Sequence, residues 1–469
     1  MSDFTGTAEV VDAATGDRAS WAELMCAASN RLAEWRRADA GGALTIAVTP
    51  RRGMSGIVDL LAAYQHDGHA AIVPAQYFAP PSNGRGARMS TATSATTISV
   101  QNGESRKPLH ELPFTTLTSQ LPGRRLFAAS GGSTGTQRVG EVPVGKLDPL
   151  PTAYRMTGLG RNSLMYVGGP WSHSAFVWAF YSALESESSV IVTSRFRPRQ
   201  VASALDDLGA VWALFPPTEF HALASVIRQD AWSPRSLRAV VTTGGRTRPA
   251  AREDWYGAMA PDRVFDMFAT TEGIGVLLAN GEEQRDRPGT SGRPVWAKVQ
   301  VRDSLNRVLG CPGETGELFM RSLSRAATEV AHFKSAGDLA QVDKDGYVFL
   351  MGRSDDEVVI EGQNVNLHAL ARAIERATNV DEAVVLEISH PDGRSPRLGV
   401  VVVGDETDAD ALRRRAAPVI AEQFGSLTIP RRWIAVQSLP ATPNGKVDRG
   451  QLKRLLDKPR VRGSMREEQ

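Results

Sequence analysis

The sequence predicts an α/β fold with a large N-terminal domain, whose parallel or mixed sheets are covered by helices, and a small α+β C-terminal domain. Three observations lead to this prediction. Short apolar runs alternate with helical stretches in the first part of the chain, hairpin-like segments begin near residue 288, and a strand–helix–strand unit follows residue 352. A chain of 469 residues is also too long for one ordinary hydrophobic core.

The alternating part of the chain predicts a parallel sheet that is covered on both faces. Nearly apolar strands, each followed by a helix, are typical of such sheets. The expected strands are residues 44–48, 70–73, 163–167, 189–192, 211–215, 237–242 and 263–267, and the expected helices are residues 54–64, 175–184, 199–208 and 250–259.

The C-terminal part of the chain has turns that contain Gly and Asp. They separate expected strands at residues 298–303, 317–320 and 347–351, and a further unit has strands at 357–360, 382–388 and 397–403 with helices at 367–378 and 408–424. We place a domain boundary near Arg353, which gives an N-terminal domain of residues 1–353 and a C-terminal domain of residues 354–469.

Composition and charge argue against several classes of function. The formal net charge is +2 and the pI is about 8.5, so we expect neither a nucleic-acid partner nor a membrane partner. Cys26 and Cys311 are too few for a disulfide framework or a metal site. The first 14 residues have no apolar core, and no run approaches the ~18 apolar residues of a membrane helix. We therefore expect a cytoplasmic protein.

A Gly/Ser/Thr loop at residues 130–138 has the composition of a phosphate-binding loop. It reads Ser-Gly-Gly-Ser-Thr-Gly-Thr-Gln-Arg and follows the apolar residues 126–129. Glycines let several backbone N–H groups approach one anion, the hydroxyls add donors, and Arg138 adds a permanent cation. Such a loop taken alone is more often an ordinary turn, and it lacks the GxxxxGK[ST] pattern.

A second motif follows the expected strand at 263–267 and consists of Phe268, Ala269, Thr270, Thr271 and Glu272. Ligands of open α/β sheets bind beyond the carboxyl ends of the strands, so this is a suitable place for a site. The Glu272 carboxylate could hold Mg²⁺. The alternative is a helix N-terminus, capped by Thr271 and with Glu272 complementing the helix dipole.

Three other segments are turns when taken singly. They contain Asp338 in Ala-Gly-Asp-Leu, Arg353 in Gly-Arg-Ser-Asp-Asp and Lys446 in Pro-Asn-Gly-Lys. A lysine in such a loop is usually a solvated surface residue. The order of these segments along the chain, after the first two motifs, is more informative than any one of them.

In this order the motifs resemble the superfamily of adenylate-forming enzymes, which comprises acyl- and aryl-CoA synthetases, adenylation domains of non-ribosomal peptide synthetases, and luciferases. The resemblance covers residues 126–449 and includes the segments 207–218 and 236–246. It implies ATP and Mg²⁺ as cofactors, a small carboxylic acid as substrate, and CoA, a carrier-protein thiol or an amine as acceptor.

The resemblance also implies a role for each matched residue. Glu272 would hold Mg²⁺, Asp355 would be the hinge between the two domains, and Lys446 would be the catalytic lysine of a mobile C-terminal domain. The nucleotide and acyl pockets would be formed by Ser130, Gly132, Ser133, Thr134, Gly135, Arg138, Gly244, Gly245, Asp266, Phe268, Thr270, Thr271, Asp338 and Arg353.

The sequence departs from the family pattern at three places. Gln137 and Arg138 replace the usual Pro-Lys of the phosphate loop, and Phe268 with Ala269 replaces Tyr-Gly. Phe268 keeps an aromatic surface that can stack on adenine. Residues 361–364 read Glu-Gly-Gln-Asn instead of Gly-Gly-Glu-Asn, in a loop that normally helps to shape the thiol tunnel.

The segment at 168–178 lies where the acyl pocket of the family begins. His173 matches a histidine that aryl-CoA ligases keep beside the acyl carboxylate; the alternative is a capping or core histidine. Ser174 stands where relatives that activate amino acids have an Asp, which argues against an α-amino acid. Phe176 and Trp178 have helical spacing and are expected in the core.

The sequence thus predicts ATP-dependent activation of a small aromatic or short acyl acid as an acyl-adenylate, release of pyrophosphate, and transfer to a thiol such as CoA. The alternative is a stand-alone adenylating enzyme of a natural-product pathway, which passes the adenylate to a carrier protein or an amine, nitrite-activating diazotase-like chemistry included. Glu272, Asp338 and Lys446 together argue against a non-catalytic binding protein.

Overall fold

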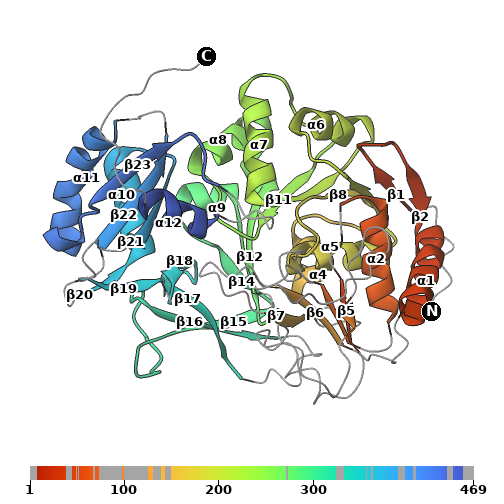
Figure 1. The fold of residues 1–469 in the computed structure, drawn as a ribbon, viewed down its shortest axis with the longest axis horizontal. Helices are drawn as coiled ribbons and strands as arrows, with labels where there is room; N and C mark the ends of the chain where they lie inside the picture. Colours follow the sequence, from red (N-terminus) through yellow and green to blue (C-terminus); the bar gives the residue numbers. More distant parts are fainter. Residues whose placement is uncertain are drawn as a thin grey trace, which may run out of the picture. The chain divides into compact units, whose positions relative to one another are not determined.

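A nine-stranded sheet of order β14-β13-β12-β11-β10-β8-β9-β1-β2 forms the centre of the larger part of the chain (Figure 1). Strands β1, β9, β8, β10, β11 and β12 run parallel, whereas β2, β13 and β14 join antiparallel to their neighbours. The predicted α/β class is therefore confirmed. The strands are β1 (Glu9–Asp12), β2 (Arg18–Ser20), β8 (Leu164–Val167), β9 (Ser189–Val192), β10 (Trp212–Phe215), β11 (Ala239–Thr243), β12 (Val264–Ala269), β13 (Val276–Asn280) and β14 (Arg293–Val295).

The computed structural model describes residues 8–38, 45–48, 50, 52–66, 69–72, 98–99, 125–129, 139–142, 149–270, 273–323, 332–354, 356–360, 363–388, 397–404, 408–440 and 447–457. The chain divides into two units between Leu350 and Met351, within strand β18 (Val348–Arg353). Each unit is described by itself below.

Two layers of helices cover the large sheet because alternate side chains of its strands point to opposite faces. On one face, α6 (Pro198–Asp207), α7 (Pro217–Arg228) and α8 (Pro249–Ala258) bury Phe215, Phe220 and Trp255. These three helices lie together in Figure 1. The opposite face is covered by α1 (Trp21–Ala38), α2 (Met54–Gln65), α4 (Pro149–Met156) and α5 (Ser174–Glu185).

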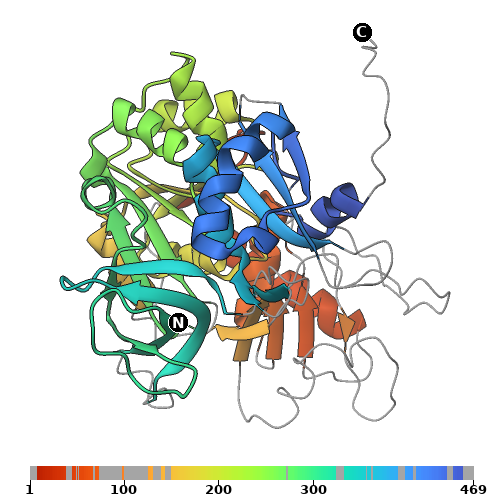
Figure 2. The ribbon, with the colours of Figure 1, turned by 90° about the vertical axis from the view of Figure 1, so that its left-hand side faces the viewer.

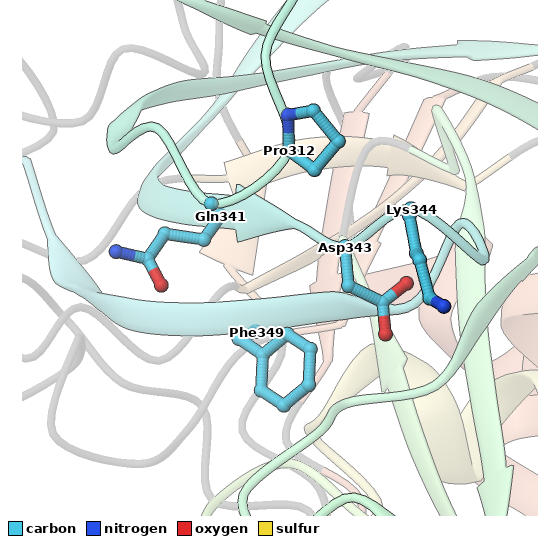
Figure 3. Close-up of a pocket in the computed structure, with 6 residues that line it drawn as sticks. Pro312, Gln341, Asp343, Lys344 and Phe349 are labelled. Carbon is cyan, nitrogen blue, oxygen red and sulfur yellow. The ribbon is translucent and has the colours of Figure 1, made fainter.

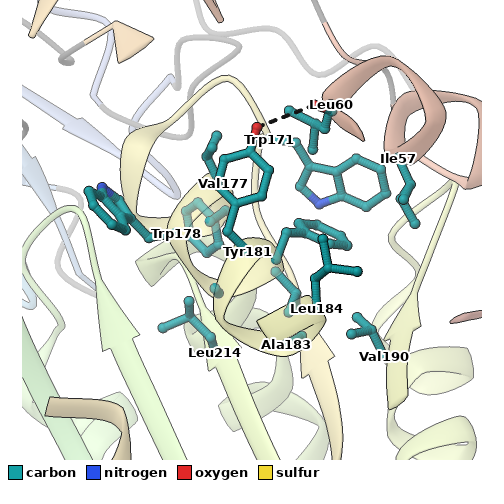
Figure 4. Close-up of a cluster of buried hydrophobic side chains, with 14 of the residues drawn as sticks. Ile57, Leu60, Trp171, Val177, Trp178, Tyr181, Ala183, Leu184, Val190 and Leu214 are labelled. Carbon is teal, nitrogen blue, oxygen red and sulfur yellow. Dashed lines mark hydrogen bonds between the residues drawn. The ribbon is translucent and has the colours of Figure 1, made fainter. Parts of the chain in front are cut away.

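Helix α5 is the most thoroughly buried of the helices that lead to the site. Trp171, Phe176 and Trp178 are at most 3% exposed, so the core prediction for Phe176 and Trp178 is confirmed. Figure 4 shows Trp171 beside Ile57 and Leu60 of α2, and the Tyr181 hydroxyl donates to the Leu60 carbonyl at 3.2 Å. Full burial of a large apolar side chain is worth about 1.5–3 kcal/mol, so this cluster fixes α5 firmly on the sheet.

Two smaller sheets complete the first unit. One has the order β5-β3-β4-β6-β7, with parallel pairs β3/β4 and β4/β6, and strands β3 and β4 lie side by side in Figure 2. The other has the order β15-β16-β17-β18, and its first two pairs are antiparallel. The strands are β3 (Thr45–Val48), β4 (His69–Ile72), β5 (Ile98–Ser99), β6 (Arg125–Ala129), β7 (Val139–Val142), β15 (Ala297–Arg302), β16 (Gly316–Ser322) and β17 (Lys334–Val342), and the short helix α9 (Gly281–Asp286) follows β13.

The second unit contains a hairpin and a three-stranded sheet between helices. The hairpin pairs β19 (Glu357–Ile360) with β20 (Gln363–Asn366), and the sheet has the order β21-β22-β23. Helices α10 (Leu367–Thr378) and α11 (Ala409–Phe424) share one core with the sheet, and α12 (Arg449–Asp457) belongs to a second one. The strands of the sheet are β21 (Glu382–Ile388), β22 (Arg397–Val403) and β23 (Arg432–Val436).

The sequence analysis missed helices α1, α4, α7, α9 and α12. Helix α7 begins with Pro216 as N-cap and Pro217 in its first turn. Two adjacent prolines usually mark a turn, but proline at the first helical position is favourable because its fixed φ suits the helix. None of the helices in the described part of the chain combines the length and hydropathy that a membrane-spanning segment needs.

Candidate active site

The candidate site lies beyond the carboxyl ends of the parallel strands. After β8, the chain places β9 on one side of that strand and β10 on the other, so the direction of the winding reverses between β8 and β10. Ligands of open α/β sheets bind in the crevice at such a reversal. The connections after β8, β10, β11 and β12 all begin at this edge.

His173 stands in the connection after β8 and caps helix α5. Its Nδ1 accepts a hydrogen bond from the backbone N–H of Ala175 at 3.4 Å, and its ring meets Phe176 edge-on with 5.9 Å between ring centroids. The structure therefore confirms that His173 is a capping residue, which was the alternative interpretation. An accepting Nδ1 places the proton of the neutral imidazole on Nε2, which is therefore a donor.

Gly244 and His173 are neighbours across the site. A Cβ atom at Gly244 would lie 3.5 Å from Cε1 and 3.6 Å from Nε2 of His173. Gly244 has a φ of +92°, a backbone conformation that favours glycine. A Cβ at Gly245 would lie 3.3 Å from Cγ of Pro217, in the first turn of α7. The structure therefore brings His173 and the Gly244–Gly245 pair together.

Asp266, on β12, is held in a polar network. Its carboxylate accepts hydrogen bonds from the Thr247 hydroxyl at 3.0 Å and 3.2 Å and from the Gln284 side-chain amide at 2.6 Å. Arg252 Nη1 lies 3.5 Å from the same carboxylate. Thr247 follows the Gly244–Gly245 pair, so this network ties the connection after β11 to β12.

Phe268 and Thr270 lie at and just after the end of β12. Phe268 is half-buried and packs against a cluster that includes Ile274, Leu277 and Met320. The Thr270 hydroxyl accepts from the backbone N–H of Ile274 at 3.2 Å, and its carbonyl accepts from Gly273 at 3.1 Å. Thr270 therefore begins a tight turn that leads from β12 toward β13.

Asp338 and Arg353 lie on strands of the sheet β15–β18. Asp338 is half-buried on β17, beside a register shift between Glu317 and Phe319 of β16. Arg353 is the last residue of β18, and its carbonyl accepts from the backbone N–H of Asp356 at 3.2 Å.

The remaining predicted site residues lie outside the described residues. They are Ser130, Gly132, Ser133, Thr134, Gly135, Arg138, Thr271, Glu272, Asp355 and Lys446. Within the described ranges, no group of three or more His, Cys, Asp or Glu side chains could hold a metal ion.

Glu219, which the sequence analysis missed, lies beneath the connection that carries His173. It is 3% exposed and forms an ion pair with Arg52. Its carboxylate also accepts from the backbone N–H of Gly169 at 3.2 Å and from the Tyr166 hydroxyl at 3.4 Å. Burial, and next the Glu219 charge, raise the pKa of Tyr166 well above its usual value. The only sequence feature that could have indicated Glu219 was its place in the first helical turn after the Pro216–Pro217 pair.

His221, two residues further along α7, links that helix to the start of α8. Its Nε2 accepts from the backbone N–H of Arg248 at 3.0 Å, and its Nδ1 lies 3.3 Å from Arg248 Nε. Burial and the nearby charges of Arg248 and Arg252 lower the pKa of His221 to about 3. His221 is therefore a neutral structural residue beside the Gly244–Thr247 connection.

A hollow on the sheet β15–β18 has different properties. It has a volume of about 530 Å³ and is lined by residues that include Gln341, Asp343 and Phe349 (Figure 3). Asp343 accepts from the backbone N–H groups of Asp345 and Tyr347, at 2.9 Å and 2.8 Å. Its carboxylate therefore closes a β-turn, and no cluster of catalytic side chains lines the hollow.

Comparisons with known proteins show what this chain is similar to. A family model described as AMP-binding enzyme matches residues 142–327, which include β8–β14. An uncharacterized acyl–CoA ligase of Bacillus subtilis is 23% identical over 299 residues, which are 62% of this chain and 60% of that protein. The 4-chlorobenzoate–CoA ligase of Arthrobacter sp is 25% identical over 345 residues, 70% of this chain and 65% of that protein.

Solved structures share the fold over almost the whole chain. The amide bond synthetase McbA of Marinactinospora thermotolerans has a TM-score of 0.64 at 19% identity and covers 96% of this chain and 97% of its own. The O-succinylbenzoate coenzyme A synthetase of Bacillus subtilis, in complex with ATP and magnesium ion, has a TM-score of 0.68 at 14% identity, with 96% and 97% covered.

The sequence alignments cover less than two thirds of the length of these two curated relatives, 60% and 65%. The matched family model nevertheless spans the strand ends that form the candidate site, and the fold extends through both units. Residues 142–327, which make up less than half of the chain, thus match the AMP-binding enzyme family, and the whole chain shares the fold of the solved adenylate- and amide-forming synthetases named above.

Proposed function

We propose that this chain activates a small carboxylic acid with ATP, forms an acyl-adenylate, releases pyrophosphate, and then transfers the acyl group to a thiol such as CoA. The observation that carries the proposal is the approach of His173 to Gly244 at the edge of the sheet where the winding reverses. The match of residues 142–327 to an AMP-binding enzyme supports it.

The chemistry requires a cation between two anions. A carboxylate oxygen attacks the α-phosphorus of ATP, the new P–O bond forms, and pyrophosphate leaves with the bonding electrons. At about 4 Å two unit charges repel by ~1 kcal/mol in water and ~4 kcal/mol at an effective dielectric of 20. Lys446, carried by the C-terminal domain, would offset this repulsion and hold the two groups in line.

No general base is needed, because a carboxylic acid is already ionised near neutral pH. Magnesium, when bound, neutralises charge on the phosphates, and a carboxylate such as that of Glu272 is the type of ligand it prefers. His173 Nε2 can donate to an oxygen of the substrate carboxylate, since Nδ1 already accepts from Ala175. Asp338 and Arg353 would contact the nucleotide, and Asp355 would be the hinge.

A compact aromatic or short acyl acid is the substrate class that we favour. Trp171, Phe176 and Trp178 pack in the core, and we place the acid beside His173 and the Gly244–Gly245 pair. Ser174 is buried and supplies no carboxylate for an α-ammonium group. One curated relative is named for an aromatic acid, 4-chlorobenzoate.

The acceptor has two candidates. CoA is favoured because the curated relatives are named CoA ligases. The alternative, a carrier protein or an amine (nitrite-activating diazotase-like chemistry included), is favoured by one observation. Residues 361–364, in the loop that normally shapes the thiol tunnel of the family, depart from its pattern.

The test is pyrophosphate release with Mg-ATP and a library of acids that includes nitrite, followed by mass spectrometry of the adenylate. Lys446→Ala should abolish adenylate formation and leave ATP binding nearly intact. Lys453→Ala is the matched control, because Lys453 is an exposed lysine on α12, seven residues further along the chain. Glu272→Gln, compared with the exposed Glu282→Gln, tests the metal ligand in the same way.

A wild-type protein that releases no pyrophosphate with any acid would sink the proposal, and so would full activity of Lys446→Ala. The acceptor follows from a second assay on the identified adenylate. Consumption of CoA, loading of a carrier protein and capture by an amine are measured side by side.

A further inference from the structure

We propose that Glu219 is a positioning residue. Its ion pair with Arg52 fixes the corner at Gly168–Gly169, and this corner in turn places His173 against Gly244. The inference rests on the proposed function, in which His173 borders the carboxylic acid. The inference assigns a role to residues outside the matched motifs, because Glu219 and Arg52 would set the geometry of the site where the acid binds.

The first observation is that one carboxylate holds three separate parts of the chain. Arg52 precedes helix α2, Tyr166 lies on β8, and Gly169 follows β8. All three donate to Glu219, which comes from the first turn of α7 after β10. The two strands next to the winding reversal are thus joined by a single side chain.

The second observation is that the corner has no room for a side chain at Gly168 or Gly169. A side chain at Gly168 would collide with the Glu219 carboxylate, and its Cβ would lie 3.1 Å from the Leu214 carbonyl oxygen. The Gly168 N–H donates to that same carbonyl at 2.9 Å. A Cβ at Gly169, which has a φ of +76°, would lie 2.5 Å from the Phe176 ring. Glu219 therefore fills the space that glycine leaves open.

The third observation connects the corner with His173. Only Pro170, Trp171 and Ser172 separate Gly169 from His173, and the backbone N–H of His173 donates to the Pro170 carbonyl at 3.0 Å. Phe176, which covers Gly169, also meets the His173 ring edge-on. A shift of the corner must therefore move the imidazole.

The fourth observation concerns the other wall of the site. Pro217, two residues before Glu219, lies against Gly245. One turn of α7 therefore contacts the connection after β8 through Glu219 and the connection after β11 through Pro217. Buried ion pairs add little net stability because desolvation offsets their attraction, whereas they can specify one geometry. Glu219 and Arg52, 4% and 26% exposed at their side chains, fit that use.

The main test is Glu219→Gln, which keeps the shape and removes the charge. We expect the kcat of pyrophosphate release to fall by about 10- to 100-fold, as for a small misplacement of a catalytic group. In a His173→Ala background, Glu219→Gln should have no further effect on kcat, because Glu219 acts through His173. Additive effects in this double-mutant cycle would overturn the proposal.

The matched control is Asp59→Asn. Asp59 is also fully buried and is paired with Arg31, at 2.6 Å, between α1 and α2. This variant should lose stability and keep the kcat of the wild type. An equal loss of kcat in both variants would show that Glu219 is merely structural.

A second readout does not depend on turnover. Diethyl pyrocarbonate modifies neutral imidazoles, and mass spectrometry gives the rate at each histidine. Glu219→Gln should change the rate at His173, while Asp59→Asn should leave it unchanged. His221, which is half-buried and accepts from the backbone N–H of Arg248, is the internal reference. An unchanged His173 rate in Glu219→Gln overturns the inference. If Glu219→Gln does not fold, Arg52→Lys, which keeps the charge but loses the guanidinium geometry, takes its place in both assays.

If the wild type is silent with every acid, the proposed function fails, and the modification experiment still decides whether Glu219 positions His173. If the wild type is active and the His173 rate does not respond to Glu219, only the inference fails.

Discussion

The imidazole of His173 faces Gly244, with 3.5 Å between Cε1 and the place that a Cβ of residue 244 would occupy. The two residues belong to connections that follow different strands, β8 and β11. Their approach defines one wall of the candidate site. It also allows a substitution that tests the site from the side of the glycine.

Gly244→Ala should lower both stability and activity. The φ of +92° is strained for alanine, by about 1–2 kcal/mol, and the added methyl group would touch His173. Gly209→Ala is the control, since Gly209 has a φ of +77° with no atom within 4 Å of the added Cβ. Urea unfolding should show similar losses in both variants, and only Gly244→Ala should lose acid-dependent pyrophosphate release. Equal activity of the two would contradict a role for this contact.

Gly168→Ala should destabilise the first unit by about 2–3 kcal/mol, which is the usual cost of overpacking. Its methyl group would meet the Glu219 carboxylate, the Tyr166 ring at 3.0 Å and the Leu214 carbonyl at 3.1 Å. Gly160→Ala, whose nearest neighbour is the Ser163 hydroxyl at 3.5 Å, should change stability by less than about 0.5 kcal/mol. The urea midpoints of unfolding of the two variants are compared with that of the wild type. A Gly168→Ala variant as stable as the wild type would mean that the backbone at Gly168–Gly169 can move to accommodate the methyl group.

Acid should destabilise the protein through His221. Its pKa is lowered to about 3 by burial and by Arg248 and Arg252, whereas the unfolded chain binds a proton near pH 6.5. The unfolded state therefore binds more protons between these values, so stability is present above pH 6.5 and is lost as pH falls toward 3. The contribution is about 2–3 kcal/mol between pH 6.5 and pH 4.5.

The check is urea unfolding at several pH values for the wild type and His221→Gln. The variant should have a flatter dependence of unfolding free energy on pH. The exposed His332→Gln should keep the dependence of the wild type. A wild-type slope in His221→Gln would disprove the assignment.

Asp266→Asn should act mainly on stability. The carboxylate accepts from Thr247 and Gln284 and lies 3.5 Å from Arg252, and loss of charge-assisted bonds of this kind costs about 1.5–3 kcal/mol. The KM for ATP should change little. The exposed Asp262→Ala is the control for loss of an acid in the same region. A large rise in the KM for ATP, with stability kept, would instead support the nucleotide-pocket role of Asp266 that the resemblance implies.

Much of the large sheet could be predicted from the sequence because its strands are short apolar runs with β-branched residues, and such runs are buried wherever they pair. His173, in contrast, was singled out only by the resemblance to aryl-CoA ligases, which keep a histidine at the matching position. Helix α7 could not be predicted in this way, because its two initial prolines read as a turn until the sheet beneath it is known.

Glu219 could not be recognised for a different reason. Its partner Arg52 is 167 residues away along the chain, and nothing local to either residue announces the pairing. The carboxylate looks like an ordinary acid in a first helical turn, where it would complement the dipole. Only the packing of α7 beside β8 shows that it is buried and engaged by three donors.

The two prolines at the start of α7 have a consequence for how this protein chooses its substrates. The proline rings restrict the φ angles of Pro216 and Pro217 even in the unfolded chain. The first turn of α7 is therefore a rigid spacer between the loop after β8, which Glu219 contacts, and the loop after β11, which Pro217 contacts. In the proposed function, the acid would bind between these two loops, whose separation this turn helps to set. We expect variants with a changed substrate preference to differ in the side chains of these two loops and to keep the prolines at the start of α7.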